Sequence, residues 1–178
     1  MNMFIILLRG VTPTGRNRVP MAELRAALAD AGLVDVRTYI QSGNVIARSP
    51  LDHASLRQLV HETIRQKIGA DITVITRTPE ELMGVLERNP FPDADQSRLY
   101  FSLLSSQPAP KLLQEFLAID CAPDEIRVVD DTIYTLYATK LSDSRFTNNF
   151  FERKLKVTAT TRNFNTMSRL VELSEQKD

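Results

Sequence analysis

The chain has little of what marks a secreted or membrane protein. It holds a single cysteine, Cys121, among 178 residues, so no disulfide can form within it, as expected in a reducing compartment. No run approaches the roughly 20 apolar residues of a membrane helix. The apolar start at residues 3–8 is too short for the core of a signal peptide. We therefore expect a cytoplasmic protein with no membrane partner.

The chain also lacks an excess of either charge. Lys and Arg together number 22, as do Asp and Glu, so the formal net charge is zero. Proteins that coat nucleic acid usually carry a basic excess, so this balance argues against that class while allowing a local basic patch.

The metal and nucleophile motifs C-x-x-C, H-E-x-x-H and G-x-S-x-G are absent from the sequence. His53 and His61 are eight residues apart on one expected helix, roughly two turns, which is too far for both to bind one metal. The sequence predicts no metal site and no cofactor. It names no general base either, so it leaves enzymatic activity open.

An apolar fraction of 43% is sufficient for a core. In the first half of the chain, the apolar residues recur at spacings typical of strands and helices. After an apolar strand, a helix starts at Pro20 and stops at Gly32. Two β-branched runs around a Gly-Asn turn predict a hairpin, and a second helix follows Asp52. Residues 3–77 thus have the order β-α-β-β-α-β of a ferredoxin-like unit, with an antiparallel sheet and two helices on one face.

The second half repeats this order except for its last strand. Residues 99–155 show the patterns β-α-β-β-α, and a helix over residues 163–173 is expected in place of the strand. Thr160 or Thr161 can cap that helix. We therefore predict an α+β fold class with two similar ferredoxin-like (βαββα) halves, whose antiparallel sheets are packed by helices.

A helix and a proline-rich connector join the two halves. Thr78 and Glu81 have the spacing of a capping box at the start of this helix, and Pro90 and Pro92 follow its end. The predicted boundaries are residues 1–92 for the N-terminal half and residues 98–178 for the C-terminal half with its added last helix.

Residues 9–20, here called the arginine loop, lie between the first strand and the first helix. Their charged residues are Arg9, Arg16 and Arg18. Flexible backbone and positive charge before a helix commonly bind an anion. The pattern Gly10 to Asn17, G-x-x-x-x-G-R-N, is close to the phosphate-binding loop G-x-x-x-x-G-K-[ST], but Asn17 replaces the hydroxyl residue that holds magnesium. We predict an anion-binding loop of another kind, and the alternative is a solvated, mobile loop.

Two other segments supply candidate ligand groups. The turn Gln41-Ser42-Gly43-Asn44 offers amides and a hydroxyl, although a tight turn alone explains its composition. Arg162-Asn163 is placed where the last helix is expected to begin, a position that favours anions. We predict one cleft lined by Arg9, Gly10, Arg16, Arg18, Gln41, Ser42, Asn44, Arg162 and Asn163, with Glu23 as a candidate partner for one arginine.

These segments resemble the bacterial family known as domain of unknown function 1697. The resemblance rests on Leu7-Leu8-Arg9-Gly10, Arg16-Asn17-Arg18-Val19-Pro20-Met21, Thr38 to Val45, Asn89-Pro90-Phe91 and Thr160 to Thr166. It implies an α+β fold of about this size and no activity or substrate. The family usually has Gly-Gly-Lys-Asn-Lys where this chain has Thr14 to Arg18, and it tends to have glycine at the position of Lys156. A helix is expected to end at Lys156, where a left-handed residue often closes a helix.

The sequence therefore predicts a domain that binds a small ligand bearing phosphate or carboxylate. A nucleic-acid-binding module and a non-catalytic interaction domain are the alternatives. Ferredoxin-like sheets bind RNA through exposed aromatic residues, but the aromatic-rich strand signature of that class is absent. The basic run from Arg145 to Arg169 has the composition of a solvated face.

Overall fold

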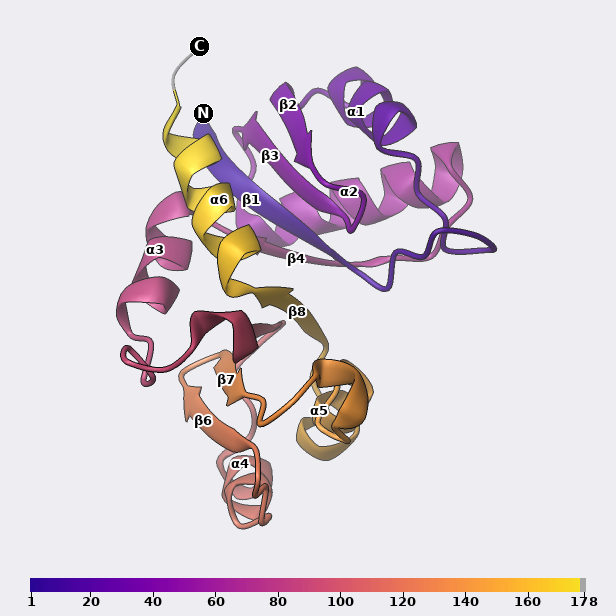
Figure 1. The fold of residues 1–178 in the computed structure, drawn as a ribbon. Coiled ribbons are helices and arrows are strands. Elements are labelled where there is room, and N and C mark those ends of the chain that lie inside the picture. The colour runs from indigo at the N-terminus through magenta and orange to yellow at the C-terminus, as the bar shows by residue number, and fades with distance from the viewer. Residues whose placement is uncertain (177–178) are drawn as a thin grey trace. The chain divides into compact units, whose positions relative to one another are not determined.

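The structure, a computed structural model, describes residues 1–176 and contains two four-stranded antiparallel sheets (Figure 1). Internal contacts divide the chain into two compact units. Unit 1 is Met1–Gly84 together with the chain from Arg169 onward, and unit 2 is Val85–Ser168. Each boundary falls within a helix rather than in the proline-rich connector, so the units differ from the predicted halves at residues 1–92 and 98–178.

Unit 1 has the element order expected from its sequence pattern. Its elements are β1 (Asn2–Arg9), α1 (Met21–Asp30), β2 (Val34–Tyr39), β3 (Asn44–Ser49), α2 (His53–Lys67) and β4 (Thr73–Arg77), followed by the start of α3 (Pro79–Glu87). The strands pair antiparallel in the order β2-β3-β1-β4. Pro20 is the N-cap of α1 rather than its first residue, because its ψ of 127° is extended.

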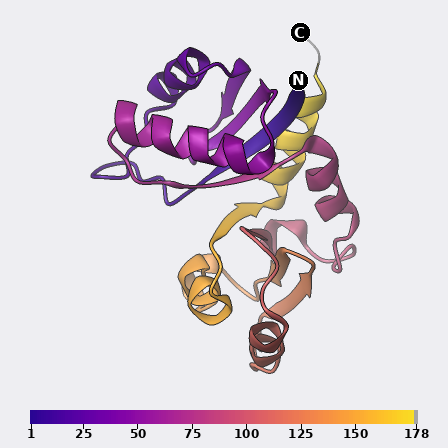
Figure 2. The same cartoon turned by 180° about the vertical axis from the view of Figure 1, so that it is seen from behind.

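The core of unit 1 lies between one face of its sheet and the two helices. Alternate residues of β1 point to this face, where Phe4, Ile6 and Leu8 are buried. Leu28 of α1 and Val60 of α2 meet them there, and Figure 2 shows α2 running across the sheet. Burying such a side chain contributes about 1.5–3 kcal/mol, so this face holds unit 1 together.

Two helix starts follow the predicted capping chemistry. The carboxylate of Asp52 accepts a hydrogen bond from the backbone N–H of Ser55 at 2.8 Å, and this bond lowers the pKa of Asp52. The capping box of α3 is confirmed: Thr78 N donates to Glu81 Oε2 at 2.8 Å, and Glu81 N donates to Thr78 Oγ1 at 3.2 Å.

Unit 2 repeats the sheet of unit 1, strand for strand. Its elements are η1 (Gln96–Arg98), β5 (Leu99–Leu104), α4 (Pro110–Leu117), β6 (Glu125–Val129), β7 (Thr132–Leu136), η2 (Leu141–Asp143), α5 (Asn148–Leu155) and β8 (Ala159–Asn163), followed by the start of α6 (Phe164–Glu175). The order β6-β7-β5-β8 matches β2-β3-β1-β4. The predicted α+β fold with two ferredoxin-like antiparallel sheets is confirmed.

The segment before the last helix was predicted incorrectly. Thr160 and Thr161 lie in β8, paired antiparallel with Leu103 and Ser102 of β5, and they do not cap a helix. β-Branched residues are favoured in a pleated strand. Strand β8 is the last strand of the β-α-β-β-α-β order, which the sequence analysis had not found in the second half. The cap of α6 is Asn163, whose Oδ1 accepts from Thr166 N at 2.8 Å.

Helix α5 ends in the left-handed conformation expected at Lys156. Lys156 has a φ of 58° and a ψ of 31°, and its N–H donates to Glu152 O at 2.9 Å. This conformation destabilises a residue other than glycine by about 1 kcal/mol.

We expect Lys156→Gly to raise the free energy of unfolding by about that amount, which corresponds to an increase of roughly 2–4 °C in the thermal midpoint. Lys156→Ala, which removes the charge and keeps the strain, is the control, and equal stability of the two variants in denaturant unfolding would contradict the account.

Candidate functional site

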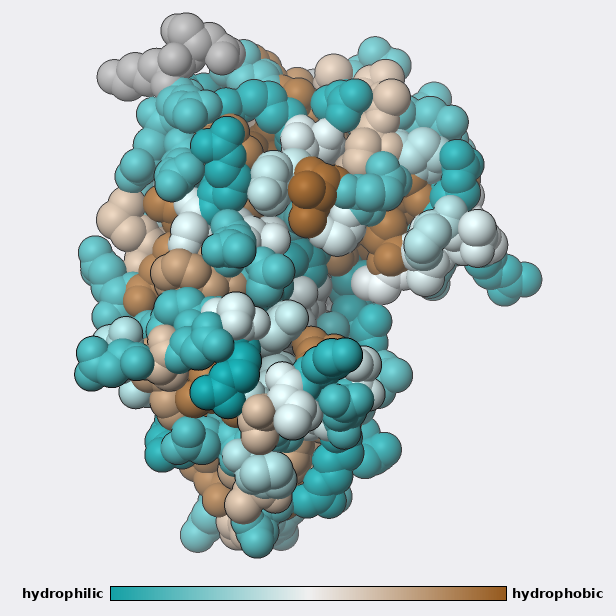
Figure 3. Space-filling view, in the orientation of Figure 1, coloured by the Kyte–Doolittle hydropathy of each residue, from teal (hydrophilic) through white to brown (hydrophobic). Residues whose placement is uncertain are grey.

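The arginine loop is closed by its own backbone. Gly10 and Gly15 have φ values of 83° and 81°, which only glycine adopts without strain. Thr12 N donates to Asn17 O at 3.0 Å across the loop. Figure 1 shows the loop extending from the end of β1, and the surface at its tip is hydrophilic in Figure 3. The loop is therefore largely exposed and has defined internal hydrogen bonds.

The turn at residues 41–44, here called the Gly43 turn, packs against both ends of the arginine loop. At the start of the loop, Leu8 N donates to Gly43 O at 2.9 Å. At its end, Gln41 Nε2 donates to Val19 O at 3.0 Å. A Cβ at Gly43 would lie 2.8 Å from Leu8 Cβ and 3.0 Å from Val11 Cγ2. The turn and the loop are thus one local structure within unit 1.

Asn44 organises the turn from within. Its side chain is fully buried, and its Nδ2 donates to Tyr39 O at 3.0 Å and to Ser42 Oγ at 3.0 Å. Gln41 and Ser42 are exposed, which is necessary if they are to contact a ligand as predicted from the sequence. Asn44 is buried and holds the turn in place through its hydrogen bonds. Ile40, which the sequence did not single out, has a φ of 50° and is 53% exposed, an unusual state for a β-branched residue.

The three arginines of the loop differ in their surroundings. Arg9 is half-buried at the end of β1, opposite Thr73 of β4, while Arg16 and Arg18 are exposed. Within residues 1–176, no carboxylate lies within 4 Å of Arg16 or Arg18. The predicted partner, Glu23, makes no ion pair with either of them, because it points from the exposed face of α1.

Arg162 and Asn163 belong to unit 2. The guanidinium of Arg162 is buried on β8, where Nη1 donates to Thr160 Oγ1 at 2.7 Å and to Thr161 O at 2.9 Å. Burial lowers the pKa of Arg162 to about 10, so the group stays charged at neutral pH. Asn163 is exposed and caps α6. Since Arg9 belongs to unit 1, the cleft shared by Arg9 and Arg162 stays a prediction.

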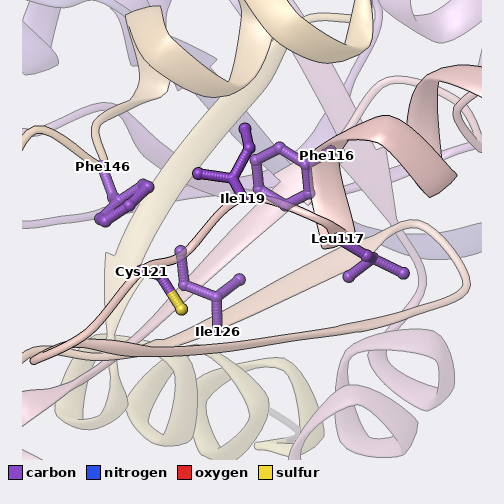
Figure 4. A pocket seen from close by; sticks show the side chains of 6 residues that line it. All are labelled: Phe116, Leu117, Ile119, Cys121, Ile126 and Phe146. Atoms are coloured by element: carbon purple, nitrogen blue, oxygen red, sulfur yellow. The ribbon is translucent and has the colours of Figure 1, made fainter.

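A small pocket in unit 2 is apolar (Figure 4). Its volume is about 30 Å³, and its walls are Phe116, Leu117, Ile119, Cys121, Ile126 and Phe146. A water needs about 10–15 Å³ on this measure, so the pocket has room for a few waters at most and is too small for a ligand. Cys121 is half-buried in this apolar wall, which fits a structural role.

The two histidines are both used in local contacts. His53 Nδ1 lies 2.8 Å from Thr76 Oγ1, and His61 Nδ1 lies 2.7 Å from Ile72 O. Over residues 1–176, no group of three His, Cys, Asp or Glu side chains is placed to hold a metal ion. In the same part of the chain, no helix combines the length and apolar character needed to cross a bilayer.

Comparison with known proteins places the chain in a family without assigning an activity. No curated protein sequence matches it. A solved structure, described as conserved bacterial protein SP0830 from Streptococcus pneumoniae, is similar over 99% of each chain, with a TM-score of 0.74 and 21% identity. That likeness shows the fold. Residues 1–134 match the family described as "Protein of unknown function (DUF1697)", and the chain therefore belongs to this family.

Proposed function

We propose that unit 1 binds a small anionic ligand, bearing phosphate or carboxylate, at the arginine loop and the Gly43 turn. The observation that carries the proposal is the state of Arg16 and Arg18. Both are exposed, two residues apart, on a loop whose two ends are bonded to one turn, and within residues 1–176 neither has a carboxylate within 4 Å. An anion between them would offset the repulsion of the two guanidinium groups.

The chemistry of the loop suits oxyanions. A guanidinium presents a planar fork of N–H donors that matches phosphate and carboxylate oxygens, often with two parallel bonds. The ideal Cβ positions of Gly10 and Gly15 have no atom within 4 Å, so a ligand can approach the backbone of the loop there. The exposed amide and hydroxyl of Gln41 and Ser42 stand at the base of the loop.

The ligand class is tested by a thermal-shift screen of nucleotides, sugar phosphates and short RNA. Removing one charge-assisted hydrogen bond costs about 1.5–3 kcal/mol of binding, or roughly a 10- to 150-fold loss of affinity. We expect Arg16→Gln/Arg18→Gln to lose the stabilisation that a bound compound gives to the wild type. Higher salt should weaken binding, because exposed charges are screened.

The control is Arg65→Gln/Lys67→Gln, which removes the same charge from the last turn of α2 in unit 1. Equal responses of the two double variants would mean that the arginine loop is not the site. No stabilising compound in the screen would favour a non-catalytic interaction domain instead.

The shared cleft is tested by Arg9→Ala and Arg162→Ala in the same screen. Loss of the response in both variants, with wild-type folding by circular dichroism, would support a site that uses both residues. Loss in Arg9→Ala alone would confine the site to unit 1 and contradict the shared cleft.

A further inference from the structure

Three cations converge on one aromatic ring in unit 2. The guanidinium carbons of Arg145 and Arg153 lie 5.7 and 5.2 Å from the ring centroid of Phe150, and Lys154 Nζ lies 5.8 Å from it. Arg145 also covers the ring of Phe146 at 4.9 Å. The π-faces attract these cations and hold each one in a defined place. Lys156, one turn later and exposed, adds a fourth positive charge.

Carboxylates do not neutralise this group, here called the α5 cation face (Arg145, Arg153, Lys154 and Lys156). Within residues 1–176, no carboxylate lies within 4 Å of any of the four. The acids nearest in the chain accept hydrogen bonds elsewhere: Glu152 Oε2 from Ala159 N at 3.1 Å, and Asp143 Oδ2 from Thr139 Oγ1 at 3.3 Å. A neutral chain therefore concentrates positive charge on α5 and the residues that flank it.

We propose that the α5 cation face binds the phosphodiester backbone of nucleic acid. The three charges lie within 6 Å of one ring centroid, so they are no more than about 12 Å apart and neighbouring phosphates of one strand can contact them together. A strand of nucleic acid presents several phosphates within that distance, each with one negative charge. The α5 cation face therefore contacts nucleic acid only through its positive charges.

The burial of the two phenylalanine rings excludes base stacking as a mode of recognition. Phe150 and Phe146 are 7% and 3% exposed, so neither can stack on a base. Recognition through phosphates carries no sequence information, and we expect binding without sequence preference. Over residues 1–176, the exposed large apolar side chains are Met1, Val34, Ile40 and Leu117, none of them on α5, so this face has nothing to insert into a lipid surface.

The experiment is fluorescence anisotropy of a labelled DNA duplex of about 20 base pairs with the full chain, at roughly 50 to 200 mM salt. One phosphate contact for each of the four cations of the α5 cation face predicts a slope of log affinity against log salt of about −3.6. We expect Arg153→Gln/Lys154→Gln to weaken binding about tenfold at low salt and to reduce the slope by about 2.

The matched control is again Arg65→Gln/Lys67→Gln, because both pairs lie in the last turn of a helix. This control and Arg16→Gln/Arg18→Gln should bind the duplex like the wild type, which separates the α5 cation face from the anion site of unit 1. Equal binding by the α5 variant and its control would overturn the proposal. So would absence of duplex binding while vesicles of phosphatidylserine and phosphatidylcholine are bound, since lipid would then be the partner.

Discussion

Gly43→Ala is expected to lower the free energy of unfolding by about 3 kcal/mol. The new Cβ would lie 2.8 Å from Leu8 Cβ, an atom of the buried core, and 3.0 Å from Val11 Cγ2. Overpacking of this kind costs about 1–3 kcal/mol. The φ of 88° adds about 1–2 kcal/mol for a residue with a side chain. The variant should also displace the arginine loop, because Gly43 O accepts from Leu8 N.

Gly69→Ala is the matched control for this prediction. Gly69 belongs to the same unit and has a φ of 85°, but its ideal Cβ position has no atom within 4 Å. Alanine there should cost only the backbone strain, about 1 kcal/mol. Urea unfolding gives the loss of unfolding free energy in each variant. The difference between the two losses is the cost of the contact between the new Cβ at residue 43 and the side chains of Leu8 and Val11. Equal losses of stability would show that Leu8 and Val11 move aside freely.

Asn44→Asp is expected to lower the free energy of unfolding by about 3 kcal/mol although it changes almost no volume. Asn44 uses its amide nitrogen, which donates to Tyr39 O and Ser42 Oγ. A carboxylate has no donor, so it would place a buried negative charge against a carbonyl oxygen. Leaving a buried group without its hydrogen bond costs about 1–3 kcal/mol, and more when it is charged.

Asn163→Asp applies the same substitution where the oxygen, not the nitrogen, makes the bond. Asn163 Oδ1 accepts from Thr166 N at the start of α6, and an aspartate caps a helix as well as an asparagine does. This variant should retain wild-type stability within about 0.5 kcal/mol. A comparable loss in both variants would show that the amide group of Asn44 does not organise the turn through its nitrogen.

The periodicity of the sequence predicted most of the fold, because local patterns determine most of these elements. Both hairpins, the capping box at Thr78 and the left-handed end of α5 at Lys156 follow from residue types at short spacing. Strand β8 was missed because Thr160 and Thr161 fit a helix cap as well as a strand. The pairing with β5 that decides between them joins residues nearly 60 positions apart.

The candidate site was only partly predictable for the same reason. The sequence predicted that residues of the arginine loop and of the Gly43 turn line one cleft, but it did not predict how the two segments contact each other. Their contact depends on the register of β1 with β3, which pairs Leu7 with Asn44 and so brings Gly43 against Leu8. The burial of Arg162 was not predicted, since it was expected at a helix start and lies in a strand instead.

The most direct test of the anion site is a titration of the isotope-labelled protein with inorganic pyrophosphate, followed by backbone amide chemical shifts. We predict progressive shifts at the amides of residues 10–19 and at Ser42, and their loss in Arg16→Gln/Arg18→Gln. The amides of residues 65–69 on α2 and after it should stay unchanged. Shifts confined to other parts of unit 1, or equal shifts in the wild type and the double variant, would contradict an anion site at the arginine loop.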